Sequence, residues 1–531
     1  MDALASTATT QHPILEALRR ILGPDHVVTD GAVRVLHGQD VFRKADPVLA
    51  VLRPGTAAEV SAVVAACAAA GLAIVPRGGG MSYTDGYVPV RADSVSLDLS
   101  RLNRIVAIDE TDMTVTAEAG VTWAALRQAL AAKGLRTPYW GPMSGLHATV
   151  GGALSQGSIF FGSAQHGAVA DSVLSIAVVT GDGTLLETGT GGSRHVDTPF
   201  FRWHGPDLTG LFCGDAGAFG VKVRATFRLL KLAPAQDYLS FGFDDHDSMA
   251  AALAAIAREG VCSEIAAFDP YLAQLRLKRA SLMTDVGALG ALVKSQGGLL
   301  KGVTAAAKVA VAGRRFMDGV EWSIHCALDA LSEAALKPAV EAVRAAAKAA
   351  GGREIETTIA RMMRAMPFPP PNSMVAPGGE RWVPAHGIVP FSRMKAAMDA
   401  CEAVFADHAA DCERFGIEHG YLMTTIATHA YLIEPCLYWP DGRNEIHTTY
   451  VEADYLRRLP EHPANPDAFA AVERIKKALG DALAHVGGTH FQLGKFYTYA
   501  PNLKPATLAV LKALKAQFDP HGVLNPGALG L

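Results

Sequence analysis

The sequence predicts an α+β chain with two domains, and three observations predict it. Short strand-like and helical stretches alternate between glycine-rich turns up to about residue 231. After that residue, alanine-rich helical stretches dominate and strand-like pieces lie between them. Half of the 531 residues are hydrophobic and 19% are charged, which is typical of a protein with a sizeable core. We therefore expect a first domain at 1–231 and a second domain at 232–484.

The first domain contains a βαβ unit. A strand at 49–53 ends at a Pro-Gly turn, and a helix at 57–71 places Val60 and Val63 on one face. A second strand at 72–76 then runs directly into three consecutive glycines. The other elements expected in this domain are helices at 13–22 and 122–133 and strands at 94–99, 105–108, 113–118, 175–180 and 221–230.

The second domain is expected to be mainly helical, with strands between the helices. A proline run at 367–371 separates two of the helical stretches, and a strand-like piece lies at 421–428. The expected helices cover 248–258, 337–350, 392–408 and 470–485. This order of elements favours a second α+β unit.

The charge and cysteine content exclude several classes of protein. Lys and Arg total 48 and Asp and Glu total 52, so the formal net charge is −4. Such a balanced surface is a poor platform for phosphates, and we expect no nucleic-acid partner. The seven cysteines are widely spaced and none forms a CxxC pair, which indicates free thiols in a reducing compartment.

No segment is expected to cross a membrane. The N-terminal residues lack a basic stretch followed by an apolar one, so no secretion signal is expected. The best candidate, 286–311, is interrupted by Lys294, Lys301 and Lys308 and falls short of the ~20 apolar residues that a span needs. A partly exposed helix is favoured there, and a helix lying on a membrane surface stays open. We expect a cytoplasmic protein, with peripheral membrane attachment as the alternative.

Three glycine-rich loops in the first domain suit a long, charged ligand. They cover 76–82, 149–157 and 211–221, where small residues let backbone N–H groups approach a ligand closely. The spacing of the first loop is neither that of a P-loop nor that of a Rossmann dinucleotide turn. Each loop alone could be a structural turn, but three of them in one domain favour a ligand that lies over strand ends.

These loops, in this order, resemble the FAD-binding domain of the vanillyl-alcohol oxidase and p-cresol methylhydroxylase (PCMH-type) family. The ending Phe518 to Gly527 resembles the FDPxGxLNPG close of those proteins, and Gly205 to Phe212 is especially similar to their aryl-alcohol branch. The resemblance implies an FAD-binding domain of two α+β subdomains and an α+β cap domain with a central antiparallel sheet. It also implies that a C-terminal segment, 485–531, returns to the FAD domain.

The same resemblance implies which residues bind FAD. The first loop would bind the diphosphate, the second region would lie along the flavin and diphosphate, and the third would hold the adenosine end. The first loop comprises Pro76, Arg77, Gly78, Gly79, Gly80, Met81 and Ser82. The second region comprises Pro142, Met143, Ser144, His147, Thr149, Val150, Gly152, Ser155, Gly157 and Ser158. The third loop contributes Gly217, Gly220 and Val221, and the C-terminal segment contributes Asn525 near the flavin edge.

One departure from the family bears on how FAD is attached. Many relatives link FAD through a histidine directly after the glycines, and this chain has Met81 there, whose thioether cannot form that link. His147 takes the place of a cysteine that doubly linked relatives use. We therefore expect non-covalent FAD, although a cap-domain histidine such as His325 or His386 stays open as a tether.

The cap domain carries a second resemblance over shorter stretches. Thr428 to Tyr431 and Cys436 to Trp439 are similar to the THxY and CxYF segments of alkylglycerone-phosphate synthase. This resemblance implies that Tyr438 takes the place of a catalytic tyrosine and His490 that of an essential histidine. With His429 they form our acid/base candidates, because a phenol or an imidazole suits proton transfer. Lys495 is the candidate for favouring an anionic flavin or substrate.

A zinc site is the competing interpretation of the same residues. The metal-dependent 2-hydroxyacid dehydrogenases of this superfamily have two histidines and a glutamate where this chain has His429, Cys436 and His490. Such a set could bind zinc in principle. The synthase shares the His-to-Cys spacing without needing a metal, so we favour a site without one.

The sequence thus predicts an FAD-dependent oxidoreductase. It would oxidise an aryl or phenolic alcohol or a hydroxyacid by hydride transfer to flavin N5, and pass electrons to oxygen or another carrier. The alternative is a flavin-assisted transferase resembling alkylglycerone-phosphate synthase, and a flavoprotein that reduces a cytochrome or a quinone also stays open. The partners expected are a small-molecule substrate and an electron acceptor, with a homodimer left open.

Three cap arginines could bind an acidic group of the substrate: Arg361, Arg364 and Arg381. A solvated helix face explains each of them as well.

Overall fold

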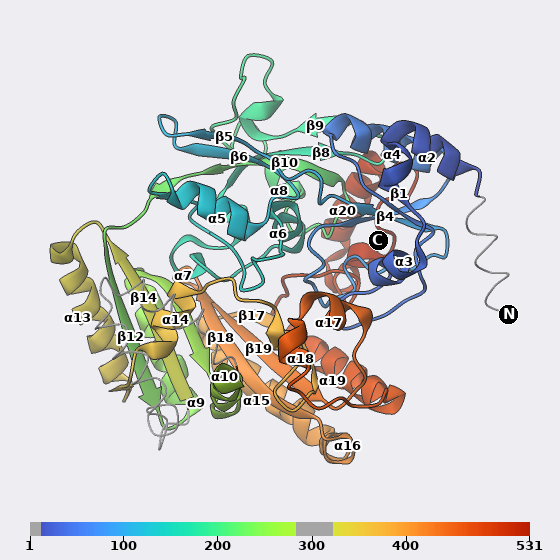
Figure 1. Ribbon diagram of the computed structural model, residues 1–531. Coiled ribbons are helices and arrows are strands. Elements are labelled where there is room, and N and C mark those ends of the chain that lie inside the picture. The colour runs from blue at the N-terminus through green and yellow to red at the C-terminus, as the bar shows by residue number, and fades with distance from the viewer. Residues whose placement is uncertain (1–11, 283–321) are drawn as a thin grey trace. The chain divides into compact units, whose positions relative to one another are not determined.

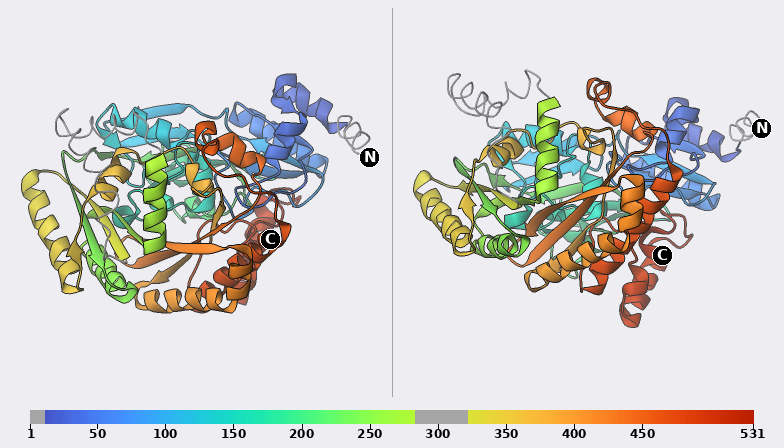
Figure 2. Two further views of the ribbon diagram at one scale, coloured as in Figure 1. Left: turned by 60° about the horizontal axis from the view of Figure 1, so that its bottom comes forward. Right: turned by 90° about the horizontal axis from the view of Figure 1, so that it is seen from below.

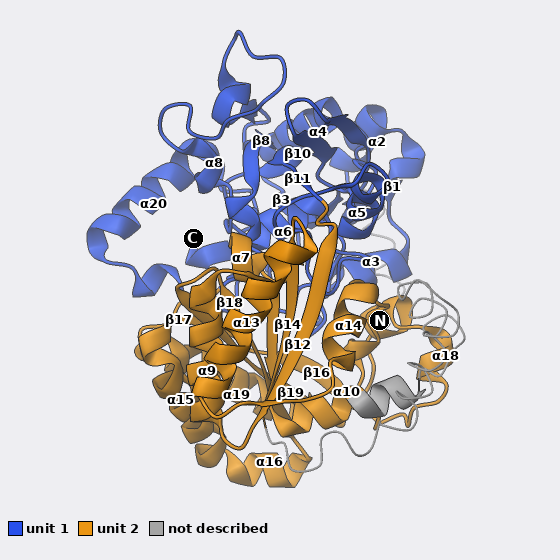
Figure 3. Cartoon of the chain, turned by 90° about the vertical axis from the view of Figure 1, so that its left-hand side faces the viewer, with its two compact units in different colours: residues 1–158, 168–231, 491–531 blue, residues 159–167, 232–490 orange. Residues whose placement is uncertain are grey.

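The computed structural model describes residues 12–282 and 322–531. The chain divides into two compact units, coloured separately in Figure 3. Unit 1 comprises Met1–Ser158, Ala168–Lys231 and Phe491–Leu531, and unit 2 comprises Ile159–Gly167 and Leu232–His490. The candidate membrane segment at 286–311 lies outside the described residues. Within the described residues, none of the helices combines the length and apolar character needed to cross a membrane.

The first sheet of unit 1 is built around the βαβ unit. Its four strands lie in the order β1 (Val27–Val28), β2 (Ala50–Leu52), β4 (Ser94–Asp98) and β3 (Ala73–Arg77). The pairs β2–β4 and β3–β4 are parallel, and helix α4 (Ala57–Ala69) connects β2 to β3. Helix α4 buries its apolar face against this sheet and against α2 (Ile14–Leu22). Figure 1 shows the two helices side by side. Because β3 is buried, the glycine loop that follows it begins from a fixed point.

The second sheet of unit 1 is antiparallel. Its strands lie in the order β5 (Ile105–Asp109), β6 (Thr114–Glu118), β10 (Val221–Arg228), β8 (Val173–Val179) and β9 (Leu185–Glu187). Two further strands, β7 (Leu135–Arg136) and β11 (Leu230–Lys231), pair with each other. The helices that accompany this sheet and the chain ends include α3 (Gly31–His37), α5 (Trp123–Ala131), α6 (Val150–Gln156), α8 (Leu208–Leu211) and α20 (Pro505–Phe518).

Unit 2 contains one eight-stranded antiparallel sheet. Seven strands lie in the order β15 (Arg353–Glu354), β12 (Ala235–Phe243), β14 (Trp322–Ala330), β13 (Cys262–Phe268), β18 (Glu418–Ile426), β19 (Ala430–Trp439) and β16 (Arg381–Pro384). The eighth strand, β17 (Gly387–Pro390), also pairs with β19. Strands β18 and β19 form a hairpin in register from Glu418 opposite Tyr438 to Ile426 opposite Ala430.

Different helices cover the two faces of this sheet. One face is covered by α9 (His246–Glu259), α13 (Glu333–Ala349), α15 (Met394–Asp407) and α19 (Pro466–His485), which Figure 2 shows along one side of the strands. The opposite face packs against α10 (Pro270–Leu282) and α14 (Thr358–Ala365). Side chains alternate between the two faces along each strand, so the even-numbered residues of β19, including Tyr438, belong to the α10 side.

The predicted fold class is confirmed, with specific omissions. The predicted helices and strands of the first domain correspond to elements of unit 1. In the second domain only the strand at 421–428 was expected at a position, and the strands on either side of it were missed. Strands β13 and β19 are buried along their whole length, and such strands lack the polar alternation that marks a half-exposed strand.

Candidate functional site

The first two glycine loops pack closely against each other in unit 1. A Cβ atom on Gly79 would lie 1.9 Å from the carbonyl oxygen of His147, and one on Gly78 would lie 2.3 Å from Oγ1 of Thr149. No side chain fits at either position, so only glycine permits this approach. The loop that follows β3 and the segment that precedes α6 therefore form one surface lined by main-chain atoms.

The third loop lies against both of the others. The backbone N–H of Gly214 donates to the carbonyl of Leu154 at 2.8 Å, and that of Ala216 donates to the carbonyl of Ser155 at 2.8 Å. A Cβ on Gly217 would meet the ring of Pro76 at 3.4 Å. The three loops, far apart in the sequence, thus converge in one region of unit 1.

A buried ion pair orders the third loop. The ammonium group of Lys222 in β10 lies 2.6 Å from the carboxylate of Asp215, and both side chains are inaccessible to solvent. The same carboxylate accepts hydrogen bonds from the backbone N–H groups of Gly217 at 3.0 Å and Phe219 at 3.4 Å. A charge buried with its partner and with donors on its remaining lone pairs holds a loop in one shape.

The C-terminal motif joins the same region. The carboxylate of Asp519 accepts hydrogen bonds from the backbone N–H groups of Val523 and Leu524. It also forms an ion pair with Lys515 at 2.6 Å, and these contacts together shape the turn. The turn delivers Asn525, whose backbone N–H donates to the carbonyl of Ile74 at 2.8 Å. Its side-chain Nδ2 donates to the carbonyls of Gly86 at 2.7 Å and Ala216 at 2.6 Å.

Strained backbone residues gather around these loops. The described residues include four non-glycine residues of this region with positive φ: Asp85 at 59°, Ala216 at 50°, Gln492 at 50° and Asn525 at 41°. Each such residue costs on the order of 1–3 kcal/mol, and strain of this kind collects at functional sites. Sequence reasoning missed Asp85 and Gln492, because nothing local marks a positive φ at an aspartate or a glutamine.

Several buried polar atoms beside the loops lack a protein partner among the described residues. They are Nη2 of Arg77, Oδ1 of Asp85, Oε1 of Gln156 and Oδ1 of Asn525. A buried polar group without a hydrogen bond is costly, so such atoms indicate a polar ligand. Together with the main-chain surface around Gly78 and Gly79, they fit a long dinucleotide with many hydrogen-bonding groups, and the residues of unit 1 therefore fit FAD.

Lys495 also lies in unit 1, close to the first loop. Its backbone N–H donates to the carbonyl of Thr84 at 3.0 Å, and its ammonium group donates to the carbonyl of Val88 at 2.6 Å. Burial lowers the pKa of this ammonium group to about 8, although the carboxylates of Asp85 and Asp40 act to raise it. The three acid/base candidates, Tyr438, His490 and His429, belong to unit 2.

Tyr438 lies near the end of β19 on the α10 side of the sheet. The side chain is buried in an apolar cluster with Leu272, Leu422 and Cys436, and its ring centroid lies 5.8 Å from that of Tyr271. Its cross-strand partners are Trp382 of β16 and Glu418 of β18. The strand therefore holds this phenol in a fixed, largely apolar setting.

The structure does not bring His429 to Tyr438. His429 is exposed in the turn between β18 and β19, nine residues before Tyr438. An extended strand of that length spans about 30 Å, so the two side chains cannot act on one substrate atom. Cys436 lies seven residues beyond His429, about 23 Å along the strand, so these two cannot ligate one zinc ion.

His490 lies beside β17, and one ring nitrogen is fixed. Nδ1 lies 2.6 Å from the carbonyl oxygen of His386, so this nitrogen carries the proton and donates it, and the backbone of Gly480 in α19 also interacts with the ring. Burial lowers the pKa of His490, which favours the neutral ring. The backbone of Thr489 pairs with that of Ile388, and Ile388 pairs with Leu432. His490 therefore lies level with the start of β19 and not with Tyr438 near its end.

The cap arginines already have partners within unit 2. Arg364 forms ion pairs with Glu264 at 2.9 Å and with Asp329, and all three side chains are nearly inaccessible. Arg381 pairs with Asp441 at 3.0 Å and lies over the ring of Trp439. These two are buried rather than on a solvated helix face, which corrects that interpretation. Arg361 donates to Thr357 and lies over the ring of Tyr238.

The two cap histidines that stayed open as tethers are both buried within unit 2. His325 is hydrogen-bonded to Ser240 at 2.9 Å and to Ser323 at 3.2 Å, and burial with Arg276 nearby lowers its pKa to about 3. Burial, followed by the charges of His490 and Lys476, lowers the pKa of His386 well below its usual value. Both rings are therefore held neutral.

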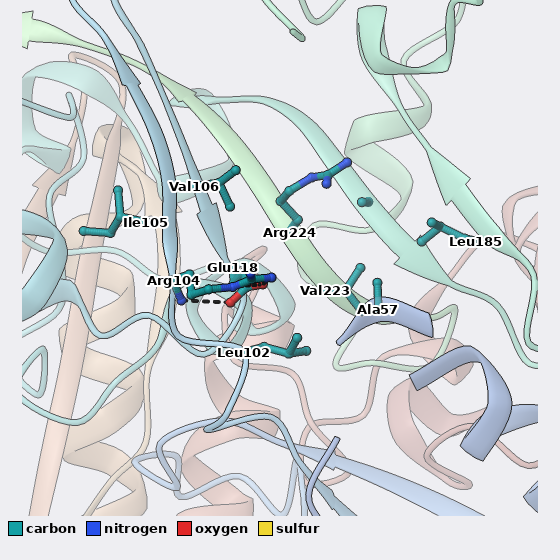
Figure 4. Close-up of a pocket in the computed structure, with 10 residues that line it drawn as sticks. Ala57, Leu102, Arg104, Ile105, Val106, Glu118, Leu185, Val223 and Arg224 are labelled. Carbon is teal, nitrogen blue, oxygen red and sulfur yellow. Dashed lines mark hydrogen bonds and ion pairs between the residues drawn. The ribbon is translucent and has the colours of Figure 1, made fainter. Parts of the chain in front are cut away.

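A separate pocket of unit 1 lies on its second sheet. This pocket of about 300 Å³ on the second sheet is lined by side chains that include Arg104, Glu118, Val223 and Arg224 (Figure 4). Arg104 and Glu118 form an ion pair at 2.6 Å along its wall. Its described lining contains no residue of the glycine loops, so it is separate from the candidate cofactor site.

The chain matches two models of protein families. Residues 48–189 match the FAD binding domain, and residues 232–529 match the C-terminal domain of FAD linked oxidases. Solved structures with the same fold include p-cresol methylhydroxylase (TM-score 0.71, 17% identity, 98% of this chain and 96% of that one). Another is alkyldihydroxyacetonephosphate synthase (TM-score 0.70, 18% identity, 97% and 86%).

Curated relatives match over a shorter part of the chain. An uncharacterized FAD-linked oxidoreductase, YgcU of Escherichia coli, is 32% identical over 239 residues, which cover 43% of this chain and 47% of the relative. A probable mitochondrial D-lactate dehydrogenase of Danio rerio is 31% identical over 227 residues (42% and 44%). The glycolate oxidase subunit GlcD of Bacillus subtilis is 29% identical over 218 residues (41% and 44%). The chain thus matches just under half the length of each of these relatives.

Proposed function

Because the chain belongs to the family of FAD-linked oxidases, we propose that it oxidises an alcohol with FAD as cofactor. The observation that carries this proposal is the convergence of three glycine loops and Asn525 in unit 1. Buried polar atoms without protein partners lie beside them. Exposed main-chain N–H groups and buried polar atoms in one region support the binding of a dinucleotide, which has many hydrogen-bonding groups.

The residues of the three loops would hold FAD. Main-chain N–H groups around Gly78 and Gly79 would approach the diphosphate, and Arg77 and Asn525 would offer side-chain polar atoms. When bound, FAD supplies an acceptor for a hydride from a substrate carbon. Binding would be non-covalent at the glycine loop, because Met81 replaces the histidine that tethers FAD in many relatives. The ammonium group of Lys495 would favour a negative charge on the ligand.

The α10 side of the unit 2 sheet would bind the substrate. Tyr438 would donate a hydrogen bond from its phenol to the substrate oxygen. His490 lies beside the start of β19 and interacts with α19, which covers the opposite face of the sheet, so it has no part in this proposal. His429, exposed in the hairpin turn, has no part in this proposal.

The substrate would be a hydroxyacid or an aryl alcohol. The names of the curated relatives support the first class, because they include a D-lactate dehydrogenase and a glycolate oxidase subunit. The electron acceptor would be oxygen or another carrier. A transferase reaction of the kind that alkylglycerone-phosphate synthase performs is the second candidate, and the place of Tyr438 within the CxYW segment favours it.

One experiment separates these candidates. The purified protein is mixed anaerobically with hydroxyacids and aryl alcohols while the visible absorbance of the flavin is followed. Persistent bleaching by an alcohol supports the oxidoreductase, and no bleaching by any of them overturns it in favour of the transferase. Acid precipitation of the same sample tests the attachment, since non-covalent FAD stays in the supernatant.

A further inference from the structure

Strand β19 presents a buried carboxyl group on the same face as Tyr438. Glu434, Cys436 and Tyr438 occupy alternate positions of the strand, so their side chains point to the same side of the sheet. The cross-strand neighbour of Glu434 is the apolar Leu422. Only 9% of Glu434 is exposed to solvent. The carboxyl group therefore lies within the sheet face that we propose to bind the substrate.

Glu434 has no ion pair within the part of the chain that the structure describes. Its side-chain hydrogen bond there is a long one from the thiol of Cys436, which lies 4.0 Å from Oε1. Other buried carboxylates of unit 2, such as Glu264 and Asp329, are paired with Arg364. A buried carboxyl group without such a partner is strongly destabilising as an anion, and residues of this kind are concentrated at functional sites.

The surroundings let Glu434 exchange a proton near neutral pH. Burial raises the pKa of its carboxyl group to about 8, and the guanidinium of Arg276 on α10 acts to lower it. The charged and titratable groups that face it are Arg276 from α10 and Cys436 from its own strand, and burial raises the pKa of that thiol well above its usual value. A base whose pKa lies near the working pH combines a useful ionised fraction with a useful proton affinity.

We propose that Glu434 takes up the proton of the substrate hydroxyl group, on the sheet face that also presents Tyr438. The proposal rests on the alcohol oxidation proposed above. In that reaction the O–H bond breaks and its proton goes to the carboxylate of Glu434. One C–H bond breaks, and the hydrogen leaves with the electron pair as a hydride, for which bound FAD would be the acceptor. A C=O bond forms at the same carbon. Atoms and electrons balance without a further co-reactant.

The geometry favours Glu434 over His429 for this task. His429 lies five residues before Glu434, about 17 Å along the chain, in an exposed turn. Glu434 and Tyr438 lie four residues apart on one face, about 13 Å between their Cα atoms. The proposal places the substrate hydroxyl group at the carboxylate of Glu434, with the phenol of Tyr438 further along the same face beyond Cys436.

The kinetic test compares Glu434→Gln with the wild type, both loaded with FAD, using benzyl alcohol and D-lactate as anaerobic probes. We expect wild-type bleaching to rise with pH through about 8, since only the carboxylate accepts a proton. The glutamine variant should bleach ~100-fold more slowly and independently of pH between 6 and 9. Glu434→Asp, which keeps the carboxyl group, should recover part of the rate. Glu413→Gln, at an exposed site in the same unit, should behave like the wild type.

A second measurement needs no substrate. Because the folded-state pKa of Glu434 lies above its usual value, protonation favours the folded protein, and this stabilisation is lost as the pH rises through about 8. The Tm of Glu434→Gln relative to the wild type should therefore rise between pH 5 and pH 9, and Glu413→Gln should show no such trend.

The outcomes separate the two proposals. A glutamine variant that bleaches at the wild-type rate with the wild-type pH profile overturns the role of Glu434 and leaves alcohol oxidation standing. Failure of every alcohol to bleach the wild type overturns alcohol oxidation, and with it the proton transfer to Glu434. A relative Tm that is constant with pH shows that Glu434 does not bind a proton in this range, which also overturns its role.

Discussion

The two units differ in where their chemistry resides. Unit 1 displays backbone: glycines that admit no Cβ, residues held at positive φ, and buried polar atoms that have no hydrogen-bond partner among the described residues. Unit 2 displays side chains on one continuous sheet, and the buried charges at Arg364 and Arg381 are paired internally. A site made of main-chain atoms needs particular glycines at particular places, whereas a site made of side chains needs only the correct strand register.

This contrast has an energetic counterpart. In unit 1 the strained residues Ala216 and Asn525 are each expected to cost on the order of 1–3 kcal/mol, which a bound ligand can offset. In unit 2 the buried charges of Arg364 and Arg381 are paired with carboxylates of the protein itself. We therefore expect changes in unit 1 to affect cofactor binding first and changes in unit 2 to affect stability or chemistry first.

The largest effect should follow from filling the main-chain surface of unit 1. In Gly79→Val the new Cβ would lie 1.9 Å from the carbonyl oxygen of His147, so the first loop must move away from the second. We expect the protein to purify without its flavin absorbance and to bind added FAD at least ~100-fold more weakly, as titration calorimetry would show. Gly31→Ala, where a Cβ meets nothing within 4 Å, should keep its flavin. Retention of FAD by Gly79→Val would show that the main-chain surface of unit 1 is not needed for cofactor binding.

The second effect concerns the paired charges of unit 2. Arg364→Met would leave Glu264 and Asp329 buried without their cation. We expect a loss of about 3–5 kcal/mol in the free energy of unfolding of the cap, measured by urea denaturation. The exposed pair Arg344–Glu354 provides the control, since Arg344→Met should cost less than about 1 kcal/mol. Equal losses in the two variants would show that the buried pairs do not stabilise unit 2.

The third effect tests chemistry rather than stability. Tyr438→Phe removes a hydroxyl group from the α10 side of the sheet and keeps the ring packing. We expect flavin reduction by an alcohol to slow ~100-fold in stopped-flow measurements, with the Tm close to that of the wild type. Tyr271→Phe is the matched control, because its ring lies beside that of Tyr438 while its hydroxyl group is bonded to Glu418. Unchanged reduction in Tyr438→Phe would remove this phenol from the mechanism.

The smallest effect is a pH dependence located in unit 1. Burial depresses the folded-state pKa of Lys495 to about 8, below that of an exposed lysine, so the unfolded chain binds more protons between these values. The stability of the wild type should therefore rise with pH from about 8 to about 10, by about 1–2 kcal/mol relative to Lys495→Met. Urea unfolding of the FAD-free protein at several pH values measures this difference. A flat difference would show that the ammonium group is not buried.

The sequence marks the glycine loops of unit 1 more plainly than the α10 side of the unit 2 sheet, and particular residues explain why. Gly78, Gly79 and Gly80 are consecutive, so their freedom from a side chain is visible in the chain itself. No local pattern singles out Glu434. Its proposed role depends on the strand to which it belongs and on whether its side chain points to the α10 side of the sheet. The alternate spacing of Glu434, Cys436 and Tyr438 would have indicated a shared face if the strand had been recognised.

His429 shows the opposite error. Its place in a motif-like segment made it a candidate, but the hairpin register puts it in an exposed turn. Spacing in a sequence does not distinguish an extended strand, in which seven residues span about 23 Å, from a helix, in which they span about 10 Å. A shared metal or substrate atom is within reach only in the second case.

The sequence by itself determined the order of elements in the first domain, the glycine loops and the C-terminal turn, because backbone freedom and hydrophobic periodicity are local properties of the chain. Tertiary structure alone decided that the loops meet Asn525, that Tyr438 and Glu434 share a face, and that Arg364 is neutralised by Glu264 and Asp329. These outcomes depend on strand pairing between distant segments. The free energy of burying a charge or a polar group likewise depends on neighbours that the local sequence does not specify.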